Sequence, residues 1–138
     1  MNTTTGLSVD DAIRQRRSVR AYAPGRLPWT RIGALLDAAV RAPTAAHAEP
    51  WSFVVVQDRA LLQRVSAHAA RLMGDPSRPE FLHRGGRAPE VFVRADVDVF
   101  HGAGTLIVIG SHVTGPHVAA DCWLAAENLM LQACATGL

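Results

Sequence analysis

Residues 35–58, LLDAAVRAPTAAHAEPWSFVVVQD, contain the transition from a predicted helix to a predicted strand. Apolar side chains recur at helical spacing over Trp29–Val40, which predicts a helix with one buried face. Pro28 would be the first residue of that helix, and Pro43 lies beyond its end. The run Trp51–Gln57 is short and rich in β-branched residues, so it predicts a buried strand.

The sequence on either side predicts two more helices and a second strand. Ser8 is a suitable N-cap for a helix over Val9–Arg16. Asp58 can cap the helix that follows the first strand, and Thr105–Gly110 predicts a second buried strand. The inner face of the helix after Asp58 would be formed by Leu61, Leu62, Val65, Ala69 and Leu72.

The second half of the chain contains a long connection and a very apolar helix. Residues 74–104 are rich in proline and glycine, which is typical of a lid or binding loop, although Val91–Phe100 within it is expected to be helical or extended. The segment His117–Thr136 predicts a helix that is apolar nearly all round, with Gly137 as its C′ cap. Such a helix is buried on all sides or lies in a subunit interface.

Length and composition predict one globular domain over residues 1–138, of 14.8 kDa and net charge +2. All fourteen basic residues are arginine. The absence of lysine excludes Schiff-base chemistry and a P-loop. Because the acids are interspersed with the bases and aromatics are few, we expect no nucleic-acid partner.

Several features of the sequence predict a cytoplasmic protein. Residues 1–6 show no apolar signal core, and no apolar run is long enough to span a bilayer. Cys122 and Cys134 would lie about 18 Å apart on one helix, too far for a disulfide. The six histidines form no HExxH pattern and there is no CxxC, so we expect no metal site.

Two segments are candidates for ligand binding. Arg16–Arg20, RRSVR, offers forked guanidinium donors and a hydroxyl that can hold a phosphate; the alternative is a solvated basic helix end. The connection Arg41–Trp51 carries small residues that let a planar ligand approach the backbone. The alternative there is an ordinary surface loop in which Trp51 packs.

Taken together, four segments resemble the nitroreductase family of flavin enzymes. They are RRSVRAY, the 35–58 stretch, HGAGTLIVIG and DCWLAAENLMLQACATGL, in that order. The resemblance implies an α+β fold with a central β-sheet flanked by helices, in an intertwined homodimer that binds FMN at the interface. Each site would be built from both chains. The family continues beyond the final Gly-Leu, so the chain is expected to be incomplete at its C-terminus.

The resemblance also assigns binding roles by position. The residues it implies as FMN ligands are Arg16, Arg17, Ser18, Arg20, Pro43, Thr44, Ala45 and His47. The first three would bind the phosphate, ribityl or pyrimidine side, and Arg20 would add positive charge near the flavin. Residues 43–45 would pass beside the isoalloxazine ring, with Trp51 as an anchor. His47 and Glu49 stand where the family typically has Asn and Gln.

The implied activity is transfer of hydride from NAD(P)H through the flavin to an electron-poor small molecule such as a nitroaromatic or quinone, in a ping-pong scheme. The flavin carries the chemistry, so no catalytic side chain is assigned. The alternative is a truncated, non-catalytic family member that binds flavin or another ligand.

Overall fold

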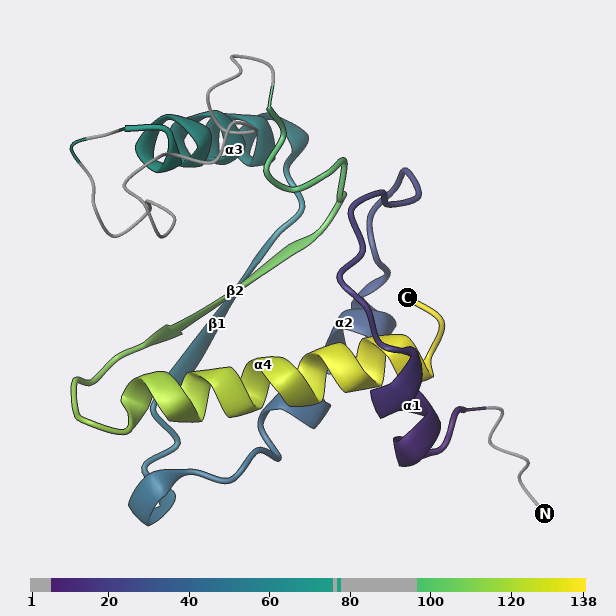
Figure 1. Cartoon of the computed structure of the whole chain (residues 1–138), viewed down its shortest axis with the longest axis vertical. Helices are drawn as coiled ribbons and strands as arrows, with labels where there is room; N and C mark the ends of the chain where they lie inside the picture. Colours follow the sequence, from purple (N-terminus) through teal and green to yellow (C-terminus); the bar gives the residue numbers. More distant parts are fainter. Residues whose placement is uncertain (1–5, 76, 78–96) are drawn as a thin grey trace. The chain divides into compact units, whose positions relative to one another are not determined.

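A computed structural model of the chain describes residues 6–75, 77 and 97–138 (Figure 1). It is an α+β structure, as expected. The elements are α1 (Val9–Gln15), α2 (Trp29–Ala39), the short 3₁₀ helix η1 (Ala45–His47), β1 (Trp51–Val56), α3 (Arg59–Met73), β2 (Leu106–Ser111) and α4 (Val118–Ala135). The predicted elements are confirmed with small shifts of their ends; Pro28, for example, is the N-cap of α2 rather than its first residue.

Helix ends are set by the capping residues that the sequence indicated. The Ser8 hydroxyl accepts a hydrogen bond from the Asp11 amide at 3.1 Å, and the Asp58 carboxylate accepts one from the Leu61 amide at 2.7 Å. Gly137 ends α4 with a φ of +75°. In this left-handed conformation the amides of Gly137 and Leu138 reach back to carbonyls in the last turn of α4.

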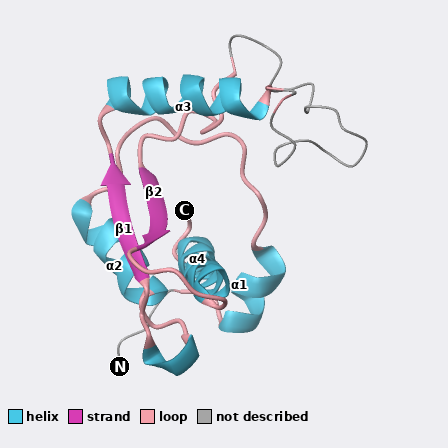
Figure 2. Cartoon of the chain, turned by 90° about the vertical axis from the view of Figure 1, so that its left-hand side faces the viewer, coloured by secondary structure: helices cyan, strands magenta, loops and turns pink. Residues whose placement is uncertain are grey.

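The sheet consists of β1 and β2 side by side (Figure 2). The strands run antiparallel: the His112 amide donates to the Pro50 carbonyl at 3.2 Å at one end, and the Gln57 amide group donates to the Thr105 hydroxyl at 2.8 Å at the other. β1 and β2 are each displaced by no more than one residue at either end from the predicted strands.

The two faces of this sheet differ in burial. The register places Phe53 opposite Ile109, and both pack against the core. Their neighbours Val54 and Val108, opposite each other on the other face, are 57% and 44% exposed. The prediction of two buried strands is therefore wrong for one face, because the described part of the chain provides no layer to cover it.

The chain divides into two compact units, and the first contains α1, α2, α4 and most of the sheet. Here α4 packs against α1 and α2. The core is formed by Ala39, Ala42, Trp51 and Ala125, which confirms Trp51 as the anchor of its segment. Cys122 and Cys134 are free thiols, as expected.

Helix α4 is not buried on all sides within the chain. Trp123 is 73% exposed, and Leu124 and Met130 are exposed as well. Only Asp121 and Ala125 of this helix are buried. The sequence predicts that this helix is either buried on all sides or lies in a subunit interface. Burial on all sides is wrong for a single chain. In the described part of the chain, no helix is both long and apolar enough to cross a membrane.

The second unit comprises residues 19–26 and the chain from Val55 to Leu106, including α3. The predicted inner face of α3 is partly wrong, because Val65 is exposed while Leu62, Ser66 and Ala70 are buried. Ser66 turns inward because its hydroxyl donates to the Asp98 carboxylate at 3.0 Å and accepts from the Val99 amide at 2.9 Å. Most of the expected lid lies outside the described residues, including residues 91–96 of the segment Val91–Phe100 that was expected to be helical or extended. Its described part, residues 97–100, is neither helix nor strand.

Asp98 organises the turn that leads into β2. Partial burial raises the pKa of this carboxyl, but hydrogen bonds from the amides of Phe100 and Gly102 and from Ser66, together with the charge of His101, outweigh burial and hold the pKa below its ordinary value. A charged Asp98 therefore favours the folded state.

We predict that acid weakens the fold in part through Asp98. Because its folded pKa is lowered, the carboxylate contributes stability above its unfolded pKa, about 3.9, and loses it as pH falls through the folded value. In urea titrations, Asp98→Asn should lose less free energy of unfolding than the unaltered chain between about pH 6 and pH 3. Asp37→Asn, which alters an exposed carboxylate paired with Arg41, is the control. Equal acid sensitivity of all three proteins would contradict the prediction.

Candidate functional site

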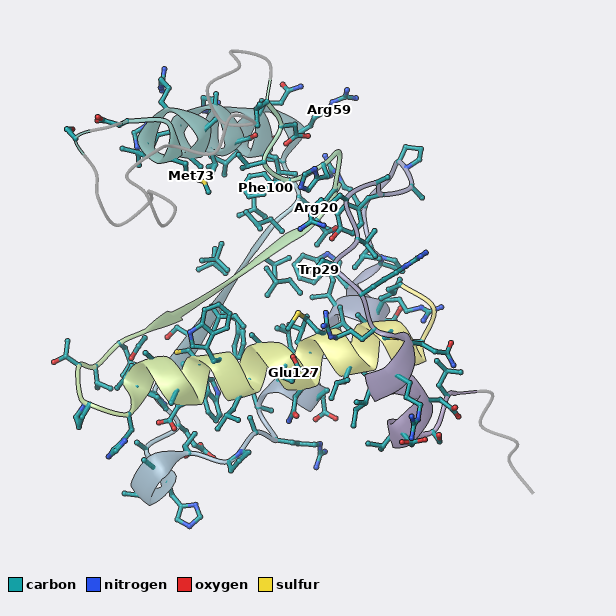
Figure 3. All side chains as sticks on the ribbon, in the orientation of Figure 1. Arg20, Trp29, Arg59, Met73, Phe100 and Glu127 are labelled. Carbon is teal, nitrogen blue, oxygen red and sulfur yellow. The ribbon has the colours of Figure 1, made fainter. Side chains whose placement is uncertain are left out.

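The basic segment begins where α1 ends. Arg16 is the C-cap of α1, and its ψ of 134° turns the following residues out of the helix. Its side chain lies beside α4, with Nε 3.9 Å from the Glu127 carboxylate, a distance too long for a hydrogen bond (Figure 3 shows Glu127 on α4). Arg16 and Glu127 thus form a long ion pair, and the Arg16 guanidinium has no hydrogen bond with any residue that the structure describes.

The other polar residues of this segment are exposed. Arg17, Ser18 and Arg20 have no side-chain hydrogen bond or ion pair with any residue that the structure describes. Arg17 and Ser18 belong to the first unit with Arg16, whereas Arg20 belongs to the second unit. The first unit thus presents two guanidinium groups and a hydroxyl within three consecutive residues.

The second candidate segment is the connection from α2 to β1. Thr44 and Ala45 are half-buried, whereas Pro43 and His47 are exposed. Ala46, His47 and Glu49 all have a left-handed backbone, with φ of 53°, 54° and 42°. Non-glycine residues rarely adopt this conformation and keep it only where their surroundings hold it.

A buried carboxylate holds this turn. Asp121 of α4 is 4% exposed, and its Oδ1 accepts a hydrogen bond from the Ala45 amide at 3.2 Å. Sequence reasoning did not assign Asp121 to the site. The available signal was an acid in the most apolar helix of the chain, where a charge is costly unless it has a partner.

Helix α4 contacts both candidate segments, but at different places. Glu127 faces Arg16, and Asp121 binds the Ala45 amide. These two α4 residues lie about 9 Å apart along the helix axis and roughly 120° apart around it. In Figure 1, α1 lies near the C-terminal end of α4, whereas η1, in blue, lies near its start. The two segments therefore contact α4 at different places within the first unit.

A cavity lies within the second unit. Its volume is about 550 Å³, and its polar lining includes Arg26, Gln57, Arg59 and Asp98. None of the predicted FMN ligands lines it. Among the described residues, no group of three or more histidine, cysteine or acidic side chains is placed to hold a metal ion.

Comparison with known proteins identifies the family. The model of the nitroreductase family matches residues 13–138. A solved nitroreductase with bound FMN from Bacteroides fragilis superposes with a TM-score of 0.79 at 25% identity, over 95% of this chain and 66% of that one.

Two curated relatives match shorter stretches. A protein named as an NADH dehydrogenase/NAD(P)H nitroreductase from Methanothermobacter thermautotrophicus is 39% identical over 59 residues, which are 43% of this chain and 31% of that protein. Iodotyrosine deiodinase 1 from Sus scrofa is 36% identical over 76 residues, 55% of this chain and 25% of that protein. With the family model matching almost the whole length and the fold shared with an FMN-bound member, the chain belongs to the nitroreductase family.

Proposed function

We propose that the chain is an FMN-dependent oxidoreductase that passes reducing equivalents from NAD(P)H to an electron-poor small molecule such as a nitroaromatic or a quinone. The observation that carries the proposal is a run of guanidinium and hydroxyl groups at Arg16–Ser18 with no side-chain hydrogen bond to any described residue, in a family member whose solved relative contains FMN. Bound FMN would supply the electron transfer, while the chain's residues bind and orient it.

The basic segment fits the phosphate of FMN. A phosphate accepts forked hydrogen bonds from guanidinium groups, and Arg16 and Arg17 offer such donors next to the Ser18 hydroxyl. Arg20, also exposed and without a partner among the described residues, is proposed to add positive charge near the flavin. Positive charge there would stabilise the reduced, anionic ring.

The turn between α2 and β1 fits the flat part of the cofactor. Small side chains at Ala45 and Ala46 leave its backbone open to close approach by a ring. Pro43, Thr44 and His47 complete the proposed contact surface. Glu49 is an exposed carboxylate on the same turn, and its charge would disfavour a second negative charge on a nearby flavin.

We propose that the two halves of the site come from two copies of the chain. In this homodimer the turn of one copy would meet the basic segment of the other, which fits their contact with α4 at different places. The apolar side chains left exposed on α1 and α4 would provide the buried contact: Val9, Ile13, Trp123, Leu124 and Met130. The cytoplasmic setting expected from the sequence stays a prediction.

A second candidate acceptor has support from the comparisons. The match to iodotyrosine deiodinase 1 is longer than the match to the archaeal nitroreductase-type protein, 76 against 59 residues. An iodinated tyrosine therefore belongs among the acceptors to be tested. The non-catalytic alternative, in which the chain binds flavin without turnover, makes a different prediction in the same assay.

The proposed function is tested first by the absorbance spectrum of the chain after incubation with FMN and desalting. We expect retained flavin bands, followed by NADH or NADPH oxidation that depends on an added nitroaromatic, quinone or iodinated tyrosine. Retained flavin without turnover on any of these acceptors would favour the non-catalytic alternative. A colourless protein would contradict the proposal that these residues hold FMN.

Removing one guanidinium should weaken FMN binding selectively. Arg16→Ala should raise the Kd for FMN about tenfold to a hundredfold, the range expected for loss of a charge-assisted hydrogen bond of about 1.5–3 kcal/mol. The matched control is Arg14→Ala, which removes an arginine from the same helix that is already paired with Asp10 at 2.8 Å. Equal Kd values for the two variants in a flavin-fluorescence titration would contradict the assignment of Arg16 as an FMN ligand.

A further inference from the structure

Beyond the residues that would contact the cofactor, we infer that Asp121 is a positioning residue for the flavin site. Its buried carboxylate holds the Ala45 amide and thereby sets the form of the turn at residues 43–49. This inference rests on the proposed function, because the turn is the segment proposed to lie beside the FMN ring.

The contact joins parts of the chain that are distant in sequence. Asp121 lies in the first turn of α4, where its own amide bonds to the His117 carbonyl at 2.9 Å. Its Oδ1 accepts from the Ala45 amide, 76 residues away, at 3.2 Å. A carboxylate that is 96% buried is costly unless it is bonded, and here the Ala45 amide is its partner.

The turn that Asp121 holds needs external support. Three of its residues, Ala46, His47 and Glu49, have left-handed backbones without being glycine. The hydrogen bonds within the turn include two long ones of 3.4 Å, which Thr44 accepts from the amides of His47 and Glu49. Among the described residues, the Asp121 bond is the side-chain hydrogen bond that ties the turn to another element.

The bond also determines which groups the turn offers to a ligand. The Ala45 amide is committed to Asp121, so it points toward α4 and is not available to the cofactor. Thr44 and Ala46, on either side of Ala45, are oriented by the same constraint. Asp121 itself is buried and acts through Ala45.

The test compares both partners of the bond. Asp121→Ala removes the acceptor, whereas Asp121→Asn retains an oxygen that can accept from the amide. Ala45→Pro removes the donor at the first residue of η1, and the extended Thr44, with φ −133° and ψ 150°, accommodates a following proline. We expect Asp121→Ala and Ala45→Pro each to raise the Kd for FMN about tenfold. The variant that carries both changes should bind FMN no more weakly than either single variant, because both changes remove the same hydrogen bond. Asp121→Asn should stay within about threefold of the unaltered chain.

A second readout needs no FMN and separates this inference from the proposed function. By hydrogen exchange, the Ala45 amide should be protected in the unaltered chain and in Asp121→Asn, and should exchange faster in Asp121→Ala. Equal exchange in all three proteins, or additive losses of FMN affinity in the double variant, would overturn the inference. If Asp121→Ala does not fold, Ala45→Pro alone decides: a Kd equal to that of the unaltered chain overturns the inference. Protection of the amide in a chain that binds no FMN would contradict only the proposed function.

Discussion

Helix α4 lies between the two candidate segments, and this placement determines how each of them is held. Through Asp121 the helix bonds to the turn before β1, and through Glu127 it faces the arginine at the end of α1. The side chains that make these two contacts point in different directions from α4, and their positions are about 9 Å apart along its axis. One chain therefore carries the two segments proposed to form a flavin site at different places along this helix.

The same placement explains where apolar surface is left exposed. Trp123 and Met130 lie on the side of α4 that also carries Glu127, since residues three, four and seven apart share a helix face. Val54 and Val108, which lie opposite each other on the sheet, are also exposed. A second copy that completes the flavin site would at the same time cover part of this surface, so cofactor binding and assembly would support each other.

Local signals predicted the elements well. Ser8, Asp58 and Gly137 each cap a helix through their own side chain or backbone, and such effects act over a few residues. Burial was predicted less well, because exposure of Val54 depends on whether another layer covers the sheet. The contacts of Asp121 and Ser66 join segments distant in sequence, and no local pattern encodes them. The basic segment and the turn were found through their motifs, and their roles in binding stay predictions.

The most direct test of the central claim mixes two variants that are defective in opposite halves of the site. One carries Arg16→Ala; the other carries Thr44→Trp, whose indole would occupy the space proposed for the ring. If each site combines the basic segment of one chain with the turn of the other, mixed dimers contain one intact site, and FMN affinity should return in about a quarter of all sites after subunit exchange. No recovery on mixing, with both variants folded and exchanging, would contradict a site built from two chains.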